Sequence, residues 1–150
     1  MSQALPHDFS DRHAHATRGD LAYQAYQTLH VAFIIAPIIA GLDKFFDRLT
    51  DWDMYLSPKA DHVLGGHGHQ FMMAVGIIEI IAGIGVAIWP RVFAYIVSLW
   101  LLLIVINLLT IPGFYDIALR DFGLCLAAFA LGRLAQVYNH PEPRLGSTTA

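Results

Sequence analysis

The chain has 150 residues, of which 56% are hydrophobic and only 14% are charged, and its net charge is −3. Soluble domains average about 25% charged residues, and nucleic-acid-binding proteins present a basic face, so the composition argues against both classes. The hydrophobic residues are grouped in long blocks, and about 20 apolar residues suffice for a helix that spans a bilayer. We therefore predict an all-α membrane protein, built as a four-transmembrane-helix bundle.

The N-terminal segment, residues 1–20, is polar and has no apolar core. It does not resemble a signal peptide, so the first apolar block is expected to remain as an uncleaved anchor. We expect the segment to be a solvated or partner-docked arm. His13 and His15 lie two residues apart, but a pair of histidines without a third ligand is weak evidence for a metal, and no metal site is predicted.

Four spans are predicted in the membrane domain, residues 21–138. They cover about residues 21–42, 69–89, 92–111 and 115–138. Pro37 lies inside the first span, where its missing N–H and its ring predict a kink. A long loop of about 25 residues follows this span, and its aromatic residues favour a re-entrant or interfacial segment. The tail, residues 139–150, is predicted to be loose.

The basic residues indicate an orientation for the bundle. Both termini lie on one side of such a bundle, which we call face A, and the opposite side is face B. Face A carries Arg12, Arg18, Arg91, Arg133 and Arg144, and face B carries Lys44, Arg48, Lys59 and Arg120. Since basic residues are in excess on the cytoplasmic side, the difference favours cytoplasmic termini.

Glu79 lies near the middle of the second span, with Gly76 and Gly83 on the same helical face. A carboxylate at the centre of a membrane helix costs about 3 kcal/mol even on the mildest insertion scale, so it usually faces other helices and marks a site. Glycines let a neighbouring backbone come close. We therefore predict that Glu79 points into the bundle rather than at lipid.

Further polar residues converge on the half of the bundle near face B. They are Asp43 and Lys44 at the end of the first span, Asn107 in the third span, and Arg120 and Asp121 in the fourth. Arg120 and Asp121 point about 100° apart around their helix, so each is expected to find a partner elsewhere or to reach toward the interface. With Glu79 below them, these groups predict a polar pocket that opens toward face B.

Two interpretations of this constellation stay open. In the structural one, Lys44 or Arg120 pairs with Asp121 or Glu79, and the network only fixes the helix register. In the functional one, the pocket takes a ligand with a small polar headgroup or passes protons. In that case Glu79 exchanges a proton or a hydrogen bond with the ligand, Lys44 and Arg120 balance the charge, and Asn107 orients the ligand.

His30 is a further candidate, about nine residues inside the first span from face A. A b-type haem needs two axial ligands at matching depth, and His67 and His69 lie near face B, so haem is not predicted. We expect His30 to be hydrogen-bonded in the core, with a quinone carbonyl as the alternative partner. Trp100 is expected to pack in the bundle. No serine nucleophile, cysteine–histidine dyad or zinc-peptidase motif is present, so no catalytic residue is predicted.

Three short motifs resemble the DoxX-like family of small four-helix bacterial membrane proteins. They are Gly41-Leu-Asp-Lys44-Phe-Phe at the end of the first span, Gly76-Ile-Ile-Glu79-Ile-Ile-Ala-Gly83 in the second, and Arg120-Asp121 at the entry to the fourth. The likeness covers about residues 21–138 and implies a quinone-linked or redox-associated subunit of the bacterial cytoplasmic (inner) membrane, rather than an enzyme acting alone. The N-terminal arm, Pro37 and the long loop depart from the family pattern and resemble docking surfaces for other subunits.

We therefore expect an accessory subunit of a larger redox or energy-transducing membrane complex, in contact with its other subunits and with lipid. Two alternatives stay open. One is a purely structural, lipid-binding scaffold subunit, and the other is a small proton-coupled carrier. Single-chain carriers are usually larger and built from repeats, which are not evident in this sequence.

Overall fold

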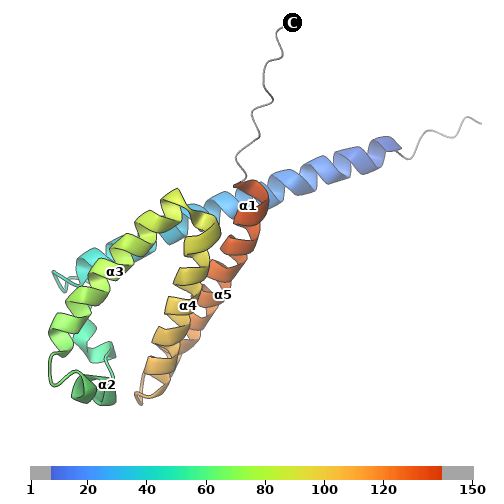
Figure 1. The fold of residues 1–150 in the computed structure, drawn as a ribbon. Coiled ribbons are helices and arrows are strands. Elements are labelled where there is room, and N and C mark those ends of the chain that lie inside the picture. Colours follow the sequence, from blue (N-terminus) through green and yellow to red (C-terminus); the bar gives the residue numbers. More distant parts are fainter. Residues whose placement is uncertain (1–7, 140–150) are drawn as a thin grey trace, which may run out of the picture.

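The computed structural model describes residues 8–139, and every regular element in that range is a helix. The elements are α1 (Asp8–Asp43), the 3₁₀ helix η1 (Trp52–Tyr55), α2 (Pro58–Val63), α3 (Gly68–Ile88), α4 (Pro90–Leu109) and α5 (Tyr115–Tyr138) (Figure 1). Three segments are long and apolar enough to span a membrane: Asp20–Asp43 of α1, α3 and α4. The predicted all-α class is confirmed, and these helices are those of a membrane protein.

The first helix is longer than the predicted first span. α1 begins at Asp8, so most of the predicted polar arm belongs to the same helix as the span, and its N-terminal part projects beyond the other helices (Figure 1). The helix continues through Pro37 without interruption, and the kink expected there stays a prediction. Of the predicted C-terminal tail, only Asn139 falls within the described residues.

α1 packs against α3 through glycines, as the sequence predicts. A Cβ atom added to Gly76 would lie 2.7 Å from the carbonyl oxygen of Gly41, and one added to Gly83 would lie 2.8 Å from that of Ile34. Neither position has room for a side chain, because the two backbones are in contact. This close approach brings the C-terminal end of α1 against the middle of α3.

α4 and α5 form the second helix pair, and small residues line their contact. Ala128 of α5 is completely buried, and the ring of Tyr95 lies against Gly132. The Ser98 hydroxyl donates a hydrogen bond of 3.0 Å to the carbonyl oxygen of Cys125. The small residues Cys125 and Gly132 of α5 therefore face α4.

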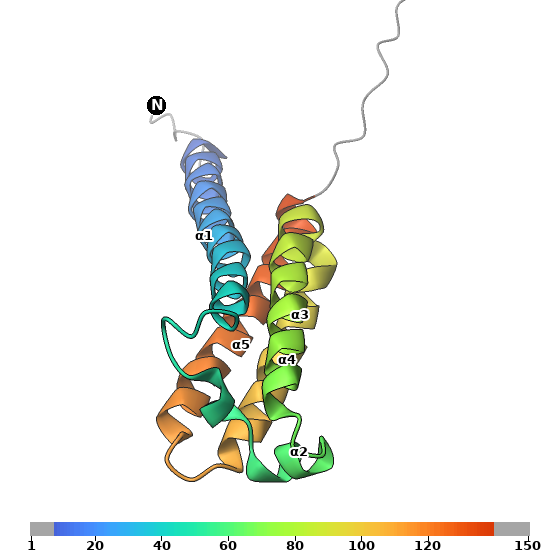
Figure 2. The same ribbon diagram turned by 90° about the vertical axis from the view of Figure 1, so that its left-hand side faces the viewer.

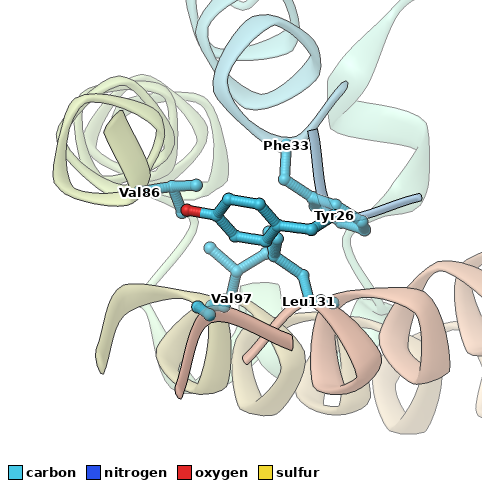
Figure 3. Close-up of a cluster of buried hydrophobic side chains, with 8 residues drawn as sticks. Tyr26, Phe33, Val86, Val97 and Leu131 are labelled. Carbon is cyan, nitrogen blue, oxygen red and sulfur yellow. The ribbon is translucent and has the colours of Figure 1, made fainter. Parts of the chain in front are cut away.

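The two helix pairs join in a hydrophobic core in the half of the bundle near face A. Tyr26 and Phe33 of α1, Val86 of α3, Val97 of α4 and Leu131 of α5 meet there, so this half is a four-helix arrangement (Figure 3). Leu131 and Val86 have no exposed surface. All four long helices therefore share one core.

The half of the bundle near face B is formed by different elements. Gly41, near the end of α1, lies beside Gly76, and α3 extends eight residues beyond that level to Gly68, or about 12 Å. Figure 2 shows α1 ending while α3, α4 and α5 continue downward, with the chain between α1 and α3 running beside them. The expectation that Lys44 lies at the face-B end of the bundle is therefore wrong.

The loop between α1 and α3 fills the fourth position in this lower half, and it contains η1 and α2. The ring of Tyr55 in η1 packs at 5.3 Å edge-to-face on Phe114, next to a small core formed by Val105 and Leu108 of α4 and Ala118 of α5. The loop is thus a packed part of the bundle, and the re-entrant or interfacial position favoured by its sequence stays a prediction.

Candidate functional site

A buried ion pair joins the end of α1 to the middle of α3. The Lys44 Nζ atom lies 2.6 Å from Glu79 Oε2, and the two side chains are 3% and 12% exposed. Glu79 faces α1 because Gly76, one turn earlier, allows the helices to touch. The prediction that this carboxylate points into the bundle is confirmed by its contact with Lys44. Because Lys44 and Glu79 are in direct contact, the predicted polar pocket does not open between these two residues.

Asp43 organises the loop that follows α1. Its carboxylate accepts hydrogen bonds from the backbone N–H groups of Arg48 at 3.1 Å and Leu49 at 3.0 Å, and from the indole N–H of Trp52 at 2.8 Å. Non-helical backbone at membrane depth is tolerated only where its polar groups find partners in the protein or in water. The buried side chain of Asp43 supplies such partners at the point where the helix ends.

Trp52 connects the loop to the ion pair. The centre of its ring lies 3.7 Å from Lys44 Nζ, the geometry of a cation–π contact. Lys44 therefore has a carboxylate on one side and an aromatic face on the other. Since the Trp52 indole also donates to Asp43, this one side chain fixes both charged residues at the end of α1.

Asp121 of α5 lies beside the same cluster. It interacts electrostatically with Lys44 and with Glu79, and its side chain is 14% exposed. The guanidinium of Arg120 folds toward it, with Arg120 Nε 3.5 Å from Asp121 Oδ1. The expectation that Arg120 and Asp121 find partners only elsewhere is therefore wrong. The Arg120 side chain is 68% exposed and long enough to cover the angle between the two positions.

Trp100 of α4 contributes an unused hydrogen-bond donor. Its indole Nε1 atom is buried and has no hydrogen-bond partner. It lies close to the Glu79 carboxylate but not in the geometry of a hydrogen bond. Sequence analysis interpreted Trp100 only as a packing residue. Its position in α4 at a depth similar to that of Glu79 was the available signal, but the direction of the indole N–H depends on the packing.

Two predicted site residues lie apart from this cluster. Asn107 holds the loop instead: its amide nitrogen donates to the carbonyl oxygen of Tyr55 at 2.6 Å, and its amide oxygen accepts from the N–H of Ser57 at 3.2 Å. His30 lies toward face A, where its Nε2 atom is 2.9 Å from the carbonyl oxygen of Val86. Its ring stacks on Tyr26, with 5.3 Å between the ring centres.

The remaining polar groups give no further centre. Over residues 20–139, no group of three or more histidine, cysteine or acidic side chains is arranged to hold a metal ion. The side chains of His13 and His15 lie outside the part described. Two surface hollows occur away from Glu79. One lies at the turn between α3 and α4, and the other is an apolar groove between α4 and α5.

The fold and the site together define an all-α membrane protein with an acid–base pair buried among its helices. Compared with known protein families, with curated proteins and with solved structures, the chain has no match. Function is therefore argued from the cluster formed by Lys44, Glu79, Trp100 and Asp121, which we call the charge cluster.

Proposed function

We propose that this chain is an accessory subunit of a redox or energy-transducing complex in the bacterial inner membrane, and that its charge cluster binds the headgroup of a quinone. The resemblance of its motifs to the DoxX-like family supports a redox association. The indole N–H of Trp100, which is buried close to the Glu79 carboxylate without a hydrogen-bond partner, is the observation that carries the proposal.

A buried donor without an acceptor costs about 1–3 kcal/mol, so such groups are uncommon unless a ligand or a water molecule completes them. Trp100 can only donate, whereas Glu79 and Asp121 can only accept when they are ionised. The partner that satisfies both sides has an oxygen that accepts and a hydroxyl that donates. A quinol offers both in one headgroup, and a quinone offers the acceptor.

A membrane-facing groove supports a ligand with a long apolar tail. It has a volume of about 470 Å³ and lies between α4 and α5, lined by side chains that include Leu102, Val105, Ala118 and Phe122. Phe122 is the neighbour of Asp121 in the sequence. An isoprenoid tail on this surface would leave its polar headgroup within reach of the half of the bundle that holds the charge cluster.

In this proposal α5 is the fourth membrane span. It has 24 residues, or about 36 Å, enough to cross the hydrocarbon core. Its intramembrane acid, Asp121, belongs to the charge cluster, and Arg133 is one turn and a half from the end of the helix, where it can extend to the interface. Because Lys44 is buried, it no longer counts among the basic residues of face B, and the excess on face A supports cytoplasmic termini.

The topology has a direct test. Short epitope tags at the N-terminus and the C-terminus should both be digested by protease in inverted membrane vesicles and both be protected in intact cells. Tags on opposite sides of the membrane would exclude α5 as a span.

The test of quinone binding is the Trp100→Phe variant, with quinone measured by extraction of the purified protein. Removing this N–H breaks no hydrogen bond within the chain, so the free energy of unfolding should not fall by more than about 1 kcal/mol. Loss of a hydrogen bond to the ligand should reduce quinone occupancy about 5- to 10-fold. Trp89→Phe, at an exposed tryptophan on face A, is the matched control and should leave occupancy unchanged.

Asp121→Asn tests the acceptor side of the same site. It removes one carboxylate but leaves the pair of Lys44 and Glu79 in place, so it should weaken quinol binding without unfolding the protein. Co-purification of larger subunits in mild detergent, read by native mass spectrometry, tests the accessory role. A wild-type protein that retains no quinone, or variants that retain as much as wild type, would refute quinone binding.

The direct contact of Lys44 with Glu79 favours one alternative, a purely structural scaffold subunit that binds lipid. In that case the pair exists to fix α1 on α3. Trp100→Phe and Asp121→Asn would then leave the activity of the whole assembly unchanged, whereas Lys44→Met would reduce the amount of assembled complex.

A further inference from the structure

A second polar feature lies at face A, away from the charge cluster. Trp89, Arg91, Val92 and Gln136 line a surface hollow of about 610 Å³. Trp89 and Arg91 belong to the tight turn between α3 and α4, and Gln136 lies in the last turn of α5. Figure 1 shows these two regions at the same end of the bundle. The hollow is therefore formed by residues far apart in the sequence.

Arg91 has no acidic partner in this hollow. The ion pairs found over residues 20–139 are those of Lys44, His69 and Arg120, and none of them involves a residue that lines the hollow. Arg91 is half-buried, which restricts its guanidinium to the neighbourhood of the hollow. Arg133, exposed and one turn before Gln136 on α5, also lacks an acidic partner in this part of the chain. Among the side chains described, those of residues 20–139, the rim is therefore positively charged and has no acidic residue to balance it.

Gln136 adds a donor that is fixed in place. Its Nε2 atom donates a hydrogen bond of 2.9 Å to the hydroxyl oxygen of Tyr95. An amide nitrogen carries two hydrogens, so the second one remains for a ligand. Tyr95 is itself held by its ring contact with Gly132, which keeps the amide at the wall of the hollow.

The hollow lies at the depth of the lipid headgroups. The apolar span of α3 ends at Ile88, which is 76% exposed, and Trp89, which is 60% exposed, follows immediately. Tryptophan at the end of a membrane helix is typical of the interface between hydrocarbon and headgroups. Arg91 lies in the first turn of α4, next to Trp89 at the lining of the hollow.

From these observations we infer that the hollow is a binding site for the phosphate of an anionic phospholipid. A guanidinium matches two phosphate oxygens with its planar fork, and the Gln136 amide supplies a further donor. Trp89 lies alongside the glycerol region and the start of the acyl chains. A lipid with net negative charge is favoured over a zwitterionic one, because no carboxylate in the hollow balances a choline or an amine.

This inference is independent of the quinone proposal, because it uses other residues at the opposite side of the membrane. The experiment is native mass spectrometry of the full chain, released from micelles after titration with phosphatidylglycerol or with phosphatidylcholine. Each basic residue near the membrane surface contributes about 1 kcal/mol toward anionic lipid, which is about a 5-fold change in affinity. Arg91→Gln should therefore retain phosphatidylglycerol about 5-fold less well than wild type.

Matched variants separate the site from general charge attraction. Lys59→Gln removes one positive charge from an exposed residue on face B and should retain the lipid like wild type. Arg91→Lys keeps the charge without the planar fork and should lie between wild type and Arg91→Gln. Gln136→Leu should lose part of the affinity while the charge stays constant.

Three results would overturn the inference. They are equal retention of the two lipids by wild type, an Arg91→Gln variant that behaves like Lys59→Gln, and release of the lipid by millimolar inorganic phosphate. The last result would show that the hollow selects a free anion rather than a lipid. Arg91→Lys and Gln136→Leu keep the test decisive if Arg91→Gln fails to fold.

Discussion

Replacing Lys44 with methionine is the most direct test of the buried ion pair, because it keeps the apolar stem of the side chain and removes the charge. Lys44 Nζ lies 2.6 Å from Glu79 Oε2, with the lysine side chain only 3% exposed. At an effective dielectric constant of about 20, unit charges at this distance attract by about 6 kcal/mol, and the desolvation of both groups offsets a large part of that.

Removing one charge leaves the other buried without its partner, and this cost sets the expected changes in the free energy of unfolding. Lys44→Met leaves a carboxylate buried without its partner, which should lower the free energy of unfolding by about 3–5 kcal/mol. Glu79→Gln leaves the ammonium with the ring of Trp52 and a neutral amide, and should cost about 2–4 kcal/mol. The double variant buries neither charge, so its loss should be smaller than the sum of the two by at least about 2 kcal/mol.

Reversible unfolding in mixed micelles, with an increasing fraction of dodecyl sulfate and circular dichroism as the signal, measures these differences. Lys59→Met is the control, since Lys59 is exposed on α2 and makes no ion pair, and it should stay within about 0.5 kcal/mol of wild type. A cost below about 1 kcal/mol for Lys44→Met, or strict additivity in the double variant, would refute the buried pair.

Three further predictions concern the packing around the pair, measured by the same unfolding assay unless stated. Gly76→Val should destabilise the protein by about 1–3 kcal/mol because it forces α1 away from α3, whereas Gly123→Ala, where an added Cβ meets nothing within 4 Å, should be neutral or slightly stabilising. Trp52→Leu should cost about 1–3 kcal/mol, since it removes both a cation–π contact and a hydrogen bond. Asn107→Leu leaves the carbonyl of Tyr55 without its partner, and protease should cut the loop several-fold faster while the helix content stays constant.

The positions of the long helices could be predicted because each apolar block ends at a residue that stops a helix. Pro90 separates α3 from α4, and Gly113 has a positive φ in the turn before α5. The direction of Glu79 followed from the glycines beside it, since a helix face with Gly76 and Gly83 is the face that another helix touches. These are local signals, readable from spacing alone.

The depth at which α1 meets α3 could not be read from spacing. Gly41 packs beside Gly76 in the middle of α3 rather than near its end, and this match depends on which surfaces fit together. An error of eight residues in that level moves Lys44 from the face-B end of the bundle to its interior. For the same reason, the choice of Lys44 over Arg120 as the partner of Glu79 stayed open until the structure placed both residues.

Contacts between residues far apart in the sequence were the other feature that the sequence did not predict. Asn107 binds the loop at Tyr55, 52 residues away, although its amide fitted a ligand site equally well on the basis of sequence. The contact between Trp52 and Lys44 likewise depends on how the loop folds back after α1. Polar side chains in a membrane must find hydrogen-bond partners. The sequence alone does not show whether that partner is the backbone of a loop or a ligand.

The charge cluster separates into two parts with different physical roles. A helix that ends inside a membrane needs partners for its loop and a positive charge near its carbonyl end, and Asp43 and Lys44 provide these with Trp52 and Glu79. Trp100 and Asp121 are not needed to end α1 or to hold the loop that follows it. They face the same carboxylate from α4 and α5, one with an unused donor and the other partly exposed. In the proposed function, a ligand that binds there gains contacts without breaking the ion pair that holds α1 on α3.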